Sequence, residues 1–186
     1  MSATKHEPGP TRRRALVALA IAVGSLGTCL AFGQEVSLAS LRATIAHEHP
    51  DVAWITVDEL ARSLRGRASA RPRLLDARAA EEFAVSHLRG ATRVDPDHPD
   101  LRPLGPDRTS PVVVYCSVGY RSALIASRLG HAGYRNVRNL EGGIFAWANR
   151  GLPVVRGDRV VHDVHPYDDT WGRMLRAELR SRTPRR

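Results

Sequence analysis

Short apolar runs alternate with amphipathic stretches along the middle of the chain. Five runs of about four residues, bounded by proline, glycine or charged residues, are typical of buried strands and lie at 52–55, 73–76, 91–94, 112–115 and 137–140. Between and before them, apolar residues spaced three and four apart predict helices over 37–48, 56–65, 79–85, 121–131 and 144–149. This alternation predicts an α/β fold, with a central, mostly parallel sheet of about five strands flanked by helices.

The N-terminal segment 1–33 has the layout of an export signal. Three consecutive arginines, 12–14, precede the apolar run 15–32, and small residues at its end suit cleavage after Gly33. Arginine is costly to move across a bilayer, so such a cluster stays in the cytoplasm. We therefore expect the following domain to be exported, either periplasmic after cleavage or anchored through residues 15–32 and facing out of the cytoplasm.

Changes in composition divide the remaining chain into three parts. Residues 34–51 are a helical lead-in, 52–156 are the α/β domain, and 157–186 are a basic tail with a short amphipathic helix. The apolar residues of that helix share one face: Trp171, Met174, Leu175 and Leu179. We prefer a helix that docks on the domain; the alternative is a basic helix that contacts an anionic membrane or a partner.

Two histidines of the tail, His162 and His165, flank Asp163 and invite comparison with a metal site. Three such residues within four positions of a tail are weak grounds for metal binding. We interpret them as surface residues and expect no metal or other cofactor.

The formal net charge of +9 is concentrated at the two ends of the chain. The section between 34 and 170 is nearly balanced, so the predicted domain carries no basic stripe of the kind that binds nucleic acid. Only two cysteines are present, which excludes a disulfide scaffold or a cysteine-rich zinc module. The charge pattern therefore favours a small-molecule enzyme or a binding module over a nucleic-acid-binding protein.

The candidate chemistry follows the strand at 112–115. Cys116 ends that strand, and Ser117, Val118, Gly119, Tyr120, Arg121 and Ser122 form a short loop that leads into a helix. Open α/β sheets bind ligands at the carboxyl ends of their strands. The loop amides, the positive end of the helix and Arg121 all favour a thiolate, so the sequence predicts a lowered pKa for Cys116. A structural core cysteine is the alternative, but it needs neither Gly119 nor Arg121.

Four ordered motifs resemble those of single rhodanese-like (sulfurtransferase) domains. They are Leu74–Arg78 with Glu81–Phe83, His87–Ala91, Tyr115–Ser122 and Leu140–Trp147, and the resemblance covers roughly residues 52–156. The sequence departs at Ser86, where the family usually has glycine, and at Arg89, where it usually has proline. The resemblance implies the three-layer rhodanese-like fold.

The resemblance also implies a function and the roles of several residues. The Cys116 thiolate would take a sulfane sulfur from a thiosulfate-like donor as a persulfide and pass it to cyanide or a thiol. Arg121 would bind the sulfonate or sulfite end of the donor. Asp76 and Arg78 would brace the active loop from behind, although an ion pair of Arg78 with Glu81, Glu82 or His87 is the simpler interpretation.

Two alternatives stay open. Phosphatases and arsenate reductases of the same fold place five residues between cysteine and arginine, whereas four separate Cys116 from Arg121. The tighter loop suits a single sulfur atom better than a tetrahedral phosphate. A sulfur-carrier or protein-binding module without turnover is the other alternative.

Overall fold

The computed structural model describes residues 36–184. Its centre is a five-stranded sheet of order β1-β5-β4-β2-β3, in which every neighbouring pair is parallel. The strands are β1 (Ala53–Ile55), β2 (Arg73–Asp76), β3 (Ala91–Arg93), β4 (Val112–Tyr115) and β5 (Val137–Leu140). Each lies within one residue of the bounds that the sequence predicts, and the predicted α/β class is confirmed.

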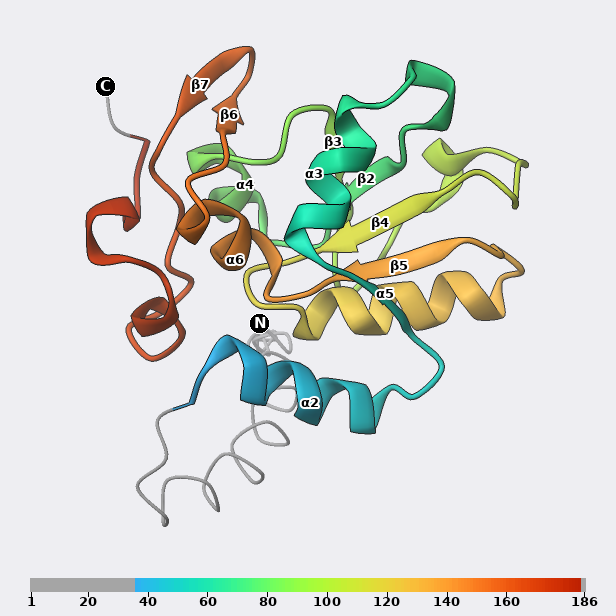
Figure 1. Cartoon of the computed structure of the whole chain (residues 1–186), viewed down its shortest axis with the longest axis horizontal. Helices are drawn as coiled ribbons and strands as arrows, with labels where there is room; N and C mark the ends of the chain where they lie inside the picture. Colours follow the sequence, from blue (N-terminus) through green and yellow to red (C-terminus); the bar gives the residue numbers. More distant parts are fainter. Residues whose placement is uncertain (1–35, 185–186) are drawn as a thin grey trace, which may run out of the picture. The chain divides into compact units, whose positions relative to one another are not determined.

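Five α-helices surround the sheet: α2 (Leu38–Glu48), α3 (Val57–Arg65), α4 (Ala80–Val85), α5 (Tyr120–His131) and α6 (Gly143–Asn149). Figure 1 shows α5 on one face of the sheet and α3 and α6 on the other. The start of α3 is fixed by a reciprocal cap, because the Thr56 hydroxyl accepts the Glu59 amide while Glu59 accepts the Thr56 amide.

The core is divided by the sheet into two layers. On one face, Val112 and Val114 of β4 pack with Ile125 and Leu129 of α5. On the other, Val113 and Tyr115 pack in a cluster with residues of three helices, Leu60 of α3, Ile144 and Phe145 of α6, and Leu41 and Ile45 of α2. Both faces of β4 are therefore covered, as its continuous apolar run predicts.

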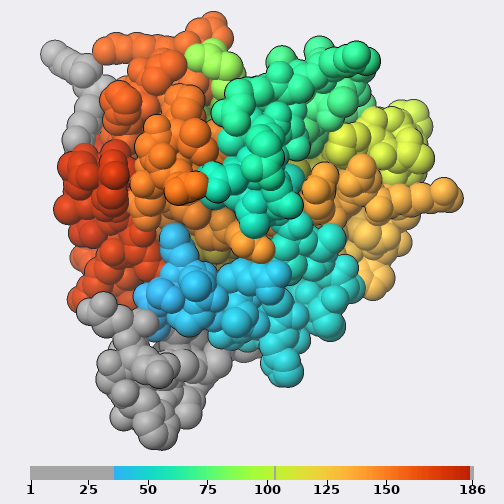
Figure 2. Space-filling model, viewed as in Figure 1, coloured from blue at the N-terminus to red at the C-terminus, as the bar shows by residue number. Residues whose placement is uncertain are grey.

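The C-terminal segment differs from its prediction. Strand β6 (Val154–Arg156) pairs antiparallel with β7 (Arg159–Val161), so the expected domain boundary at 156 falls inside a hairpin. The expected amphipathic helix is absent; two short 3-10 helices, η3 (Trp171–Met174) and η4 (Ala177–Leu179), take its place. Leu175 and Leu179 are nevertheless buried in the core cluster, and Figure 2 shows the segment packed beside the α6 and hairpin residues.

Asn149 provides the physical reason for the missing helix. Its side-chain amide donates to the Met174 carbonyl at 2.7 Å and accepts from the Arg176 amide at 2.9 Å. These two bonds use backbone groups that a continuous helix would pair internally. The apolar spacing is thus satisfied by docking, while α6 interrupts the helix.

The expected export segment 1–33 lies outside the described residues. Within residues 36–184, no helix combines the length and the apolar character needed to cross a bilayer.

Candidate active site

Cys116 lies at the carboxyl end of β4, the middle strand of the sheet. The chain turns into α5 through Gly119, whose φ of +112° is a conformation that side chains rarely adopt. The loop is also held from below, because the Cys116 and Ser117 carbonyls accept the amides of Ile144 and Phe145 at 2.9 and 3.1 Å. Strand end, helix start and α6 together fix the shape of this loop.

The sulfur of Cys116 faces the start of α5. The Gly119 amide donates to Sγ at 3.2 Å, and the residue is 1% exposed. In the described part of the chain, the amides of Tyr120, Arg121 and Ser122 find no backbone or side-chain acceptor. Free amides at a helix start carry partial positive charge, so the loop offers an anion the donors that an extra sulfur needs.

Arg121 is held by a glutamate that the sequence did not assign to it. Its Nη1 and Nη2 donate to the two carboxylate oxygens of Glu82 at 2.7 and 2.9 Å, and Nη2 also donates to the Ser117 hydroxyl at 3.0 Å. The Ser117 hydroxyl in turn donates to Glu82 at 2.8 Å. The end-on fork of the guanidinium is therefore already occupied by Glu82.

The two charges stabilise each other. Burial raises the pKa of Glu82, but hydrogen bonding and attraction to Arg121 outweigh it and hold the pKa below its ordinary value. Burial lowers the pKa of Arg121, but the Glu82 hydrogen bond and the charges of Cys116 and Glu82 outweigh it and raise the pKa. Both groups thus stay charged at neutral pH, and Glu82 offsets the charge that Arg121 offers to the sulfur.

A Glu82→Gln variant should lose stability in a pH-dependent way. Because the pKa of Glu82 is lowered on folding, its contribution is complete above the unfolded value, about 4.3, and is lost as pH falls through the folded value. We expect a loss of about 2 kcal/mol at neutral pH for this partly buried pair. Urea unfolding at pH 7 and near pH 3 should show the difference from wild type shrinking with acid. A difference independent of pH would contradict the assignment.

Asp76 and Arg78 form a separate ion pair behind the loop. Arg78 Nε and Nη2 donate to the two Asp76 oxygens at 2.9 and 2.6 Å, and both side chains are completely buried. Nη2 also donates to the Ser86 carbonyl at 2.6 Å, which ties the end of β2 to the end of α4. The expected partner was Glu81, Glu82 or His87; Asp76 is preferred because it lies two residues away on the same turn.

The other predicted loop residues are distributed differently. Val118 points into the core cluster and is 5% exposed, so its side chain does not line an entrance. The Tyr120 ring is half-buried beside His49; burial, and then a hydrogen bond with Glu48, raise its pKa. Ser122 is fully buried, and its hydroxyl has no partner among the described residues.

Sequence reasoning missed three residues around the loop besides Glu82. Asn139 of β5 donates to the Gly119 carbonyl at 2.8 Å and so orients the amide that reaches the sulfur. His165 is buried rather than on the surface as expected, and Tyr167 places its ring 4.9 Å from the Arg121 guanidinium carbon. No local signal identifies them, because each reaches the loop through long-range packing.

Both departures from the family motif contact the C-terminal segment. The Ser86 hydroxyl donates to the Asp163 carbonyl at 2.6 Å. Arg89 Nη2 donates to the Asp158 carbonyl in the β6–β7 turn at 3.2 Å. Neither contact involves the loop around Cys116.

The comparisons with known proteins agree with this architecture. Residues 56–150 match the family described as the rhodanese-like domain. A sulfurtransferase of Allochromatium vinosum is 37% identical over 82 residues, which cover 44% of this chain and 77% of the relative. Thiosulfate sulfurtransferase 16 of Arabidopsis thaliana is 33% identical over 93 residues, covering 44% and 78%.

A solved structure gives the same result. The polysulfide-sulfur transferase homodimer of Wolinella succinogenes is 25% identical, with a TM-score of 0.50 over 63% of this chain and 88% of that one. The motif resemblance and the three-layer fold that it implies are thereby confirmed. The chain belongs to the rhodanese-like domain family.

Proposed function

We propose that the protein is a sulfurtransferase that carries a sulfane sulfur as a persulfide on Cys116. The observation that carries the proposal is the Gly119 amide 3.2 Å from Sγ, in a loop that opens α5 with further free amides. An amide donor and a helix start both stabilise a thiolate, which is the nucleophilic form of cysteine. The relatives named as sulfurtransferases support the same chemistry.

The reaction balances with thiosulfate as donor and cyanide as acceptor. The Cys116 thiolate attacks the outer sulfur of thiosulfate, the sulfur–sulfur bond breaks, and sulfite leaves with the bonding pair. Cyanide then attacks the outer sulfur of the persulfide and leaves as thiocyanate, which returns Cys116 as a thiolate. No redox partner or metal is needed, because sulfur moves with its electrons between nucleophiles.

The loop favours a compact cargo. One sulfur atom added to Cys116 stays among the amides of Gly119 and the first turn of α5. Arg121 has given its end-on fork to Glu82, so a sulfonate would meet single remaining donors rather than a bidentate clamp. Binding through the sulfur and the amides therefore supports a donor bound mainly by its sulfane end.

The test is intact-mass analysis of the full chain after incubation with thiosulfate. We expect a gain of about 32 Da on Cys116, reversed by cyanide with release of thiocyanate, and no gain in Cys116→Ser. A phosphate ester assayed in parallel should not turn over. An unchanged mass would contradict persulfide chemistry, and ester hydrolysis lost in Cys116→Ser would favour a phosphatase.

A further inference from the structure

The C-terminal segment reaches the active loop through Tyr167. This residue lies beyond residues 56–150 that match the family, and its ring covers one face of Arg121 at 4.9 Å. The ring is 39% exposed, so it touches the guanidinium and also meets solvent. Arg121 is thus bounded by Glu82 at its end and by Tyr167 on its face.

Tyr167 is held in a costly conformation. Its φ of +66° is the only positive value among the non-glycine residues that the structure describes. The conformation is fixed by its amide, which donates to Nδ1 of the buried His165 at 3.0 Å. Burial lowers the pKa of His165 although Glu82 opposes it, which keeps Nδ1 free to accept. Strain of this kind is commonly found where a side chain is needed at a functional site.

The segment on both sides of this turn is anchored to the domain. The Asp163 carboxylate pairs with Arg156 at 2.6 Å, and its carbonyl accepts the Ser86 hydroxyl. The Val164 amide donates to the Leu179 carbonyl at 2.7 Å. Tyr167 is therefore presented by a fixed support and not by a free tail.

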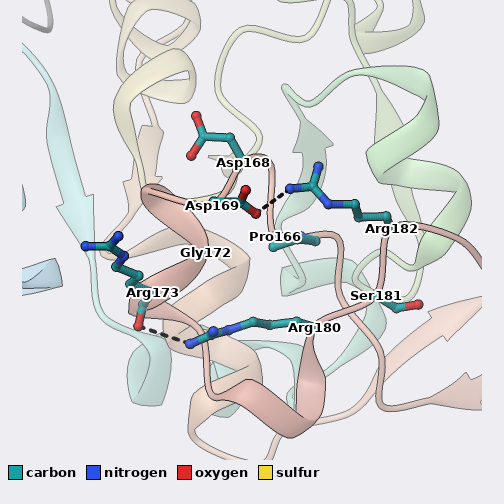
Figure 3. A pocket seen from close by; sticks show the side chains of 8 residues that line it. All are labelled: Pro166, Asp168, Asp169, Gly172, Arg173, Arg180, Ser181 and Arg182. Carbon is teal, nitrogen blue, oxygen red and sulfur yellow. Dashed lines mark hydrogen bonds and ion pairs between the residues drawn. The ribbon is translucent and has the colours of Figure 1, made fainter.

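A charged cavity begins at the residues adjacent to Tyr167. It has a volume of about 400 Å³ and is lined by Pro166, Asp168, Asp169, Gly172, Arg173, Arg180, Ser181 and Arg182. In Figure 3, Arg182 reaches across to Asp169, while Arg180 runs along the opposite side toward the main chain of Arg173. The size is that of a site for a small molecule, and its lining carries charges of both signs.

We propose that Tyr167 and this cavity form the binding site of the sulfur acceptor, a small zwitterionic thiol such as an amino-acid or peptide thiol. Guanidinium groups bind carboxylates, and the aspartates suit an ammonium group. Cyanide and simple alkyl thiols have no such groups. This inference rests on the proposed sulfurtransferase function, of which it names the acceptor class.

The transfer step balances without a further reactant. The acceptor thiolate attacks the outer sulfur of the Cys116 persulfide, and a new sulfur–sulfur bond forms on the acceptor. The bond between Sγ and the outer sulfur breaks, and Cys116 leaves as a thiolate. Tyr167 would contact the carbon skeleton of the acceptor beside Arg121, while its charged ends occupy the cavity.

Acceptor kinetics test the assignment in the full chain. With thiosulfate as donor, glutathione carries carboxylates and an ammonium group, whereas 2-mercaptoethanol is the uncharged match. We expect Arg182→Gln and Tyr167→Gly each to lower kcat/KM for glutathione relative to 2-mercaptoethanol by about fivefold. Glycine adopts the φ of Tyr167 without strain, so that variant removes the ring but keeps the turn. An unchanged ratio in both variants would overturn the proposal.

A matched control and a binding measurement complete the test. Arg128→Gln removes an exposed arginine of α5 outside the cavity lining and should leave the ratio unchanged. Calorimetry with S-methylglutathione, which cannot accept sulfur, should show saturable binding to Cys116→Ser that weakens when Arg182→Gln is added. No binding would overturn the site. Binding without any sulfur transfer in the wild type would instead reject the proposed function and leave the site standing.

Discussion

The Gly143→Ala variant should unfold about 10 °C below the wild type and lose sulfur transfer. A Cβ at this position would lie 2.3 Å from the Cys116 carbonyl oxygen and 2.6 Å from that of Ser117, both of them backbone atoms. These are the same carbonyls that accept the first amides of α6, so neither can move without breaking a bond under the loop. Overpacking against backbone and a φ of +55° together cost about 3–5 kcal/mol.

Gly151→Ala is the matched control for this variant. Gly151 follows α6 with a φ of +73°, but a Cβ there would have no heavy atom within 4 Å. It therefore carries the conformational cost alone, about 1 kcal/mol. Thermal unfolding of both variants, with persulfide formation measured by mass, separates the clash from the strain. Equal melting temperatures would show that the close approach to the loop is unimportant.

Removing Asp76 should be as damaging, for an electrostatic reason. Asp76→Ala leaves Arg78 buried and without its carboxylate, which costs about 3–5 kcal/mol. Burial lowers the pKa of Arg78, but attraction to Asp76 outweighs it and raises the pKa, so the wild-type guanidinium is charged at any ordinary pH. The variant cannot easily relieve the charge by losing a proton.

A double variant tests whether charge or shape is responsible. Asp76→Ala combined with Arg78→Met removes both charges and leaves an apolar side chain of similar length. Urea unfolding should show the double variant to be more stable than Asp76→Ala alone, because pairs within contact are strongly coupled. If the two variants are equally unstable, packing at position 76 and not the unpaired charge is what matters.

The strands and the loop could be predicted from local patterns because their signals are local. Continuous apolar runs such as Val112–Tyr115 identify buried strands, and a cysteine at the end of such a run locates the site. The helix start beyond Gly119 follows from the same reading and is found at Tyr120. These features depend on periodicity and on the few residues on either side of each element.

The partners of the loop could not be predicted in the same way. Glu82 and Arg121 are 39 residues apart, and only the packing of α4 against the loop decides that Arg121 is its partner. His165 is buried because β7 and the segment after it fold back on the domain. The tail helix fails for a related reason, since Asn149 of α6 takes up backbone groups that the periodicity alone assigns to a helix.

The contacts of Ser86 and Arg89 have a consequence for what constitutes the cooperative folding unit. Both side chains bond carbonyls of the segment 157–163, and both occur at positions where the sequence departs from the family's usual glycine and proline. Domain and extension are therefore complementary at these two points. A chimera that grafts this extension onto another member's domain would need the serine and the arginine as well, because without them the graft lacks both attachments.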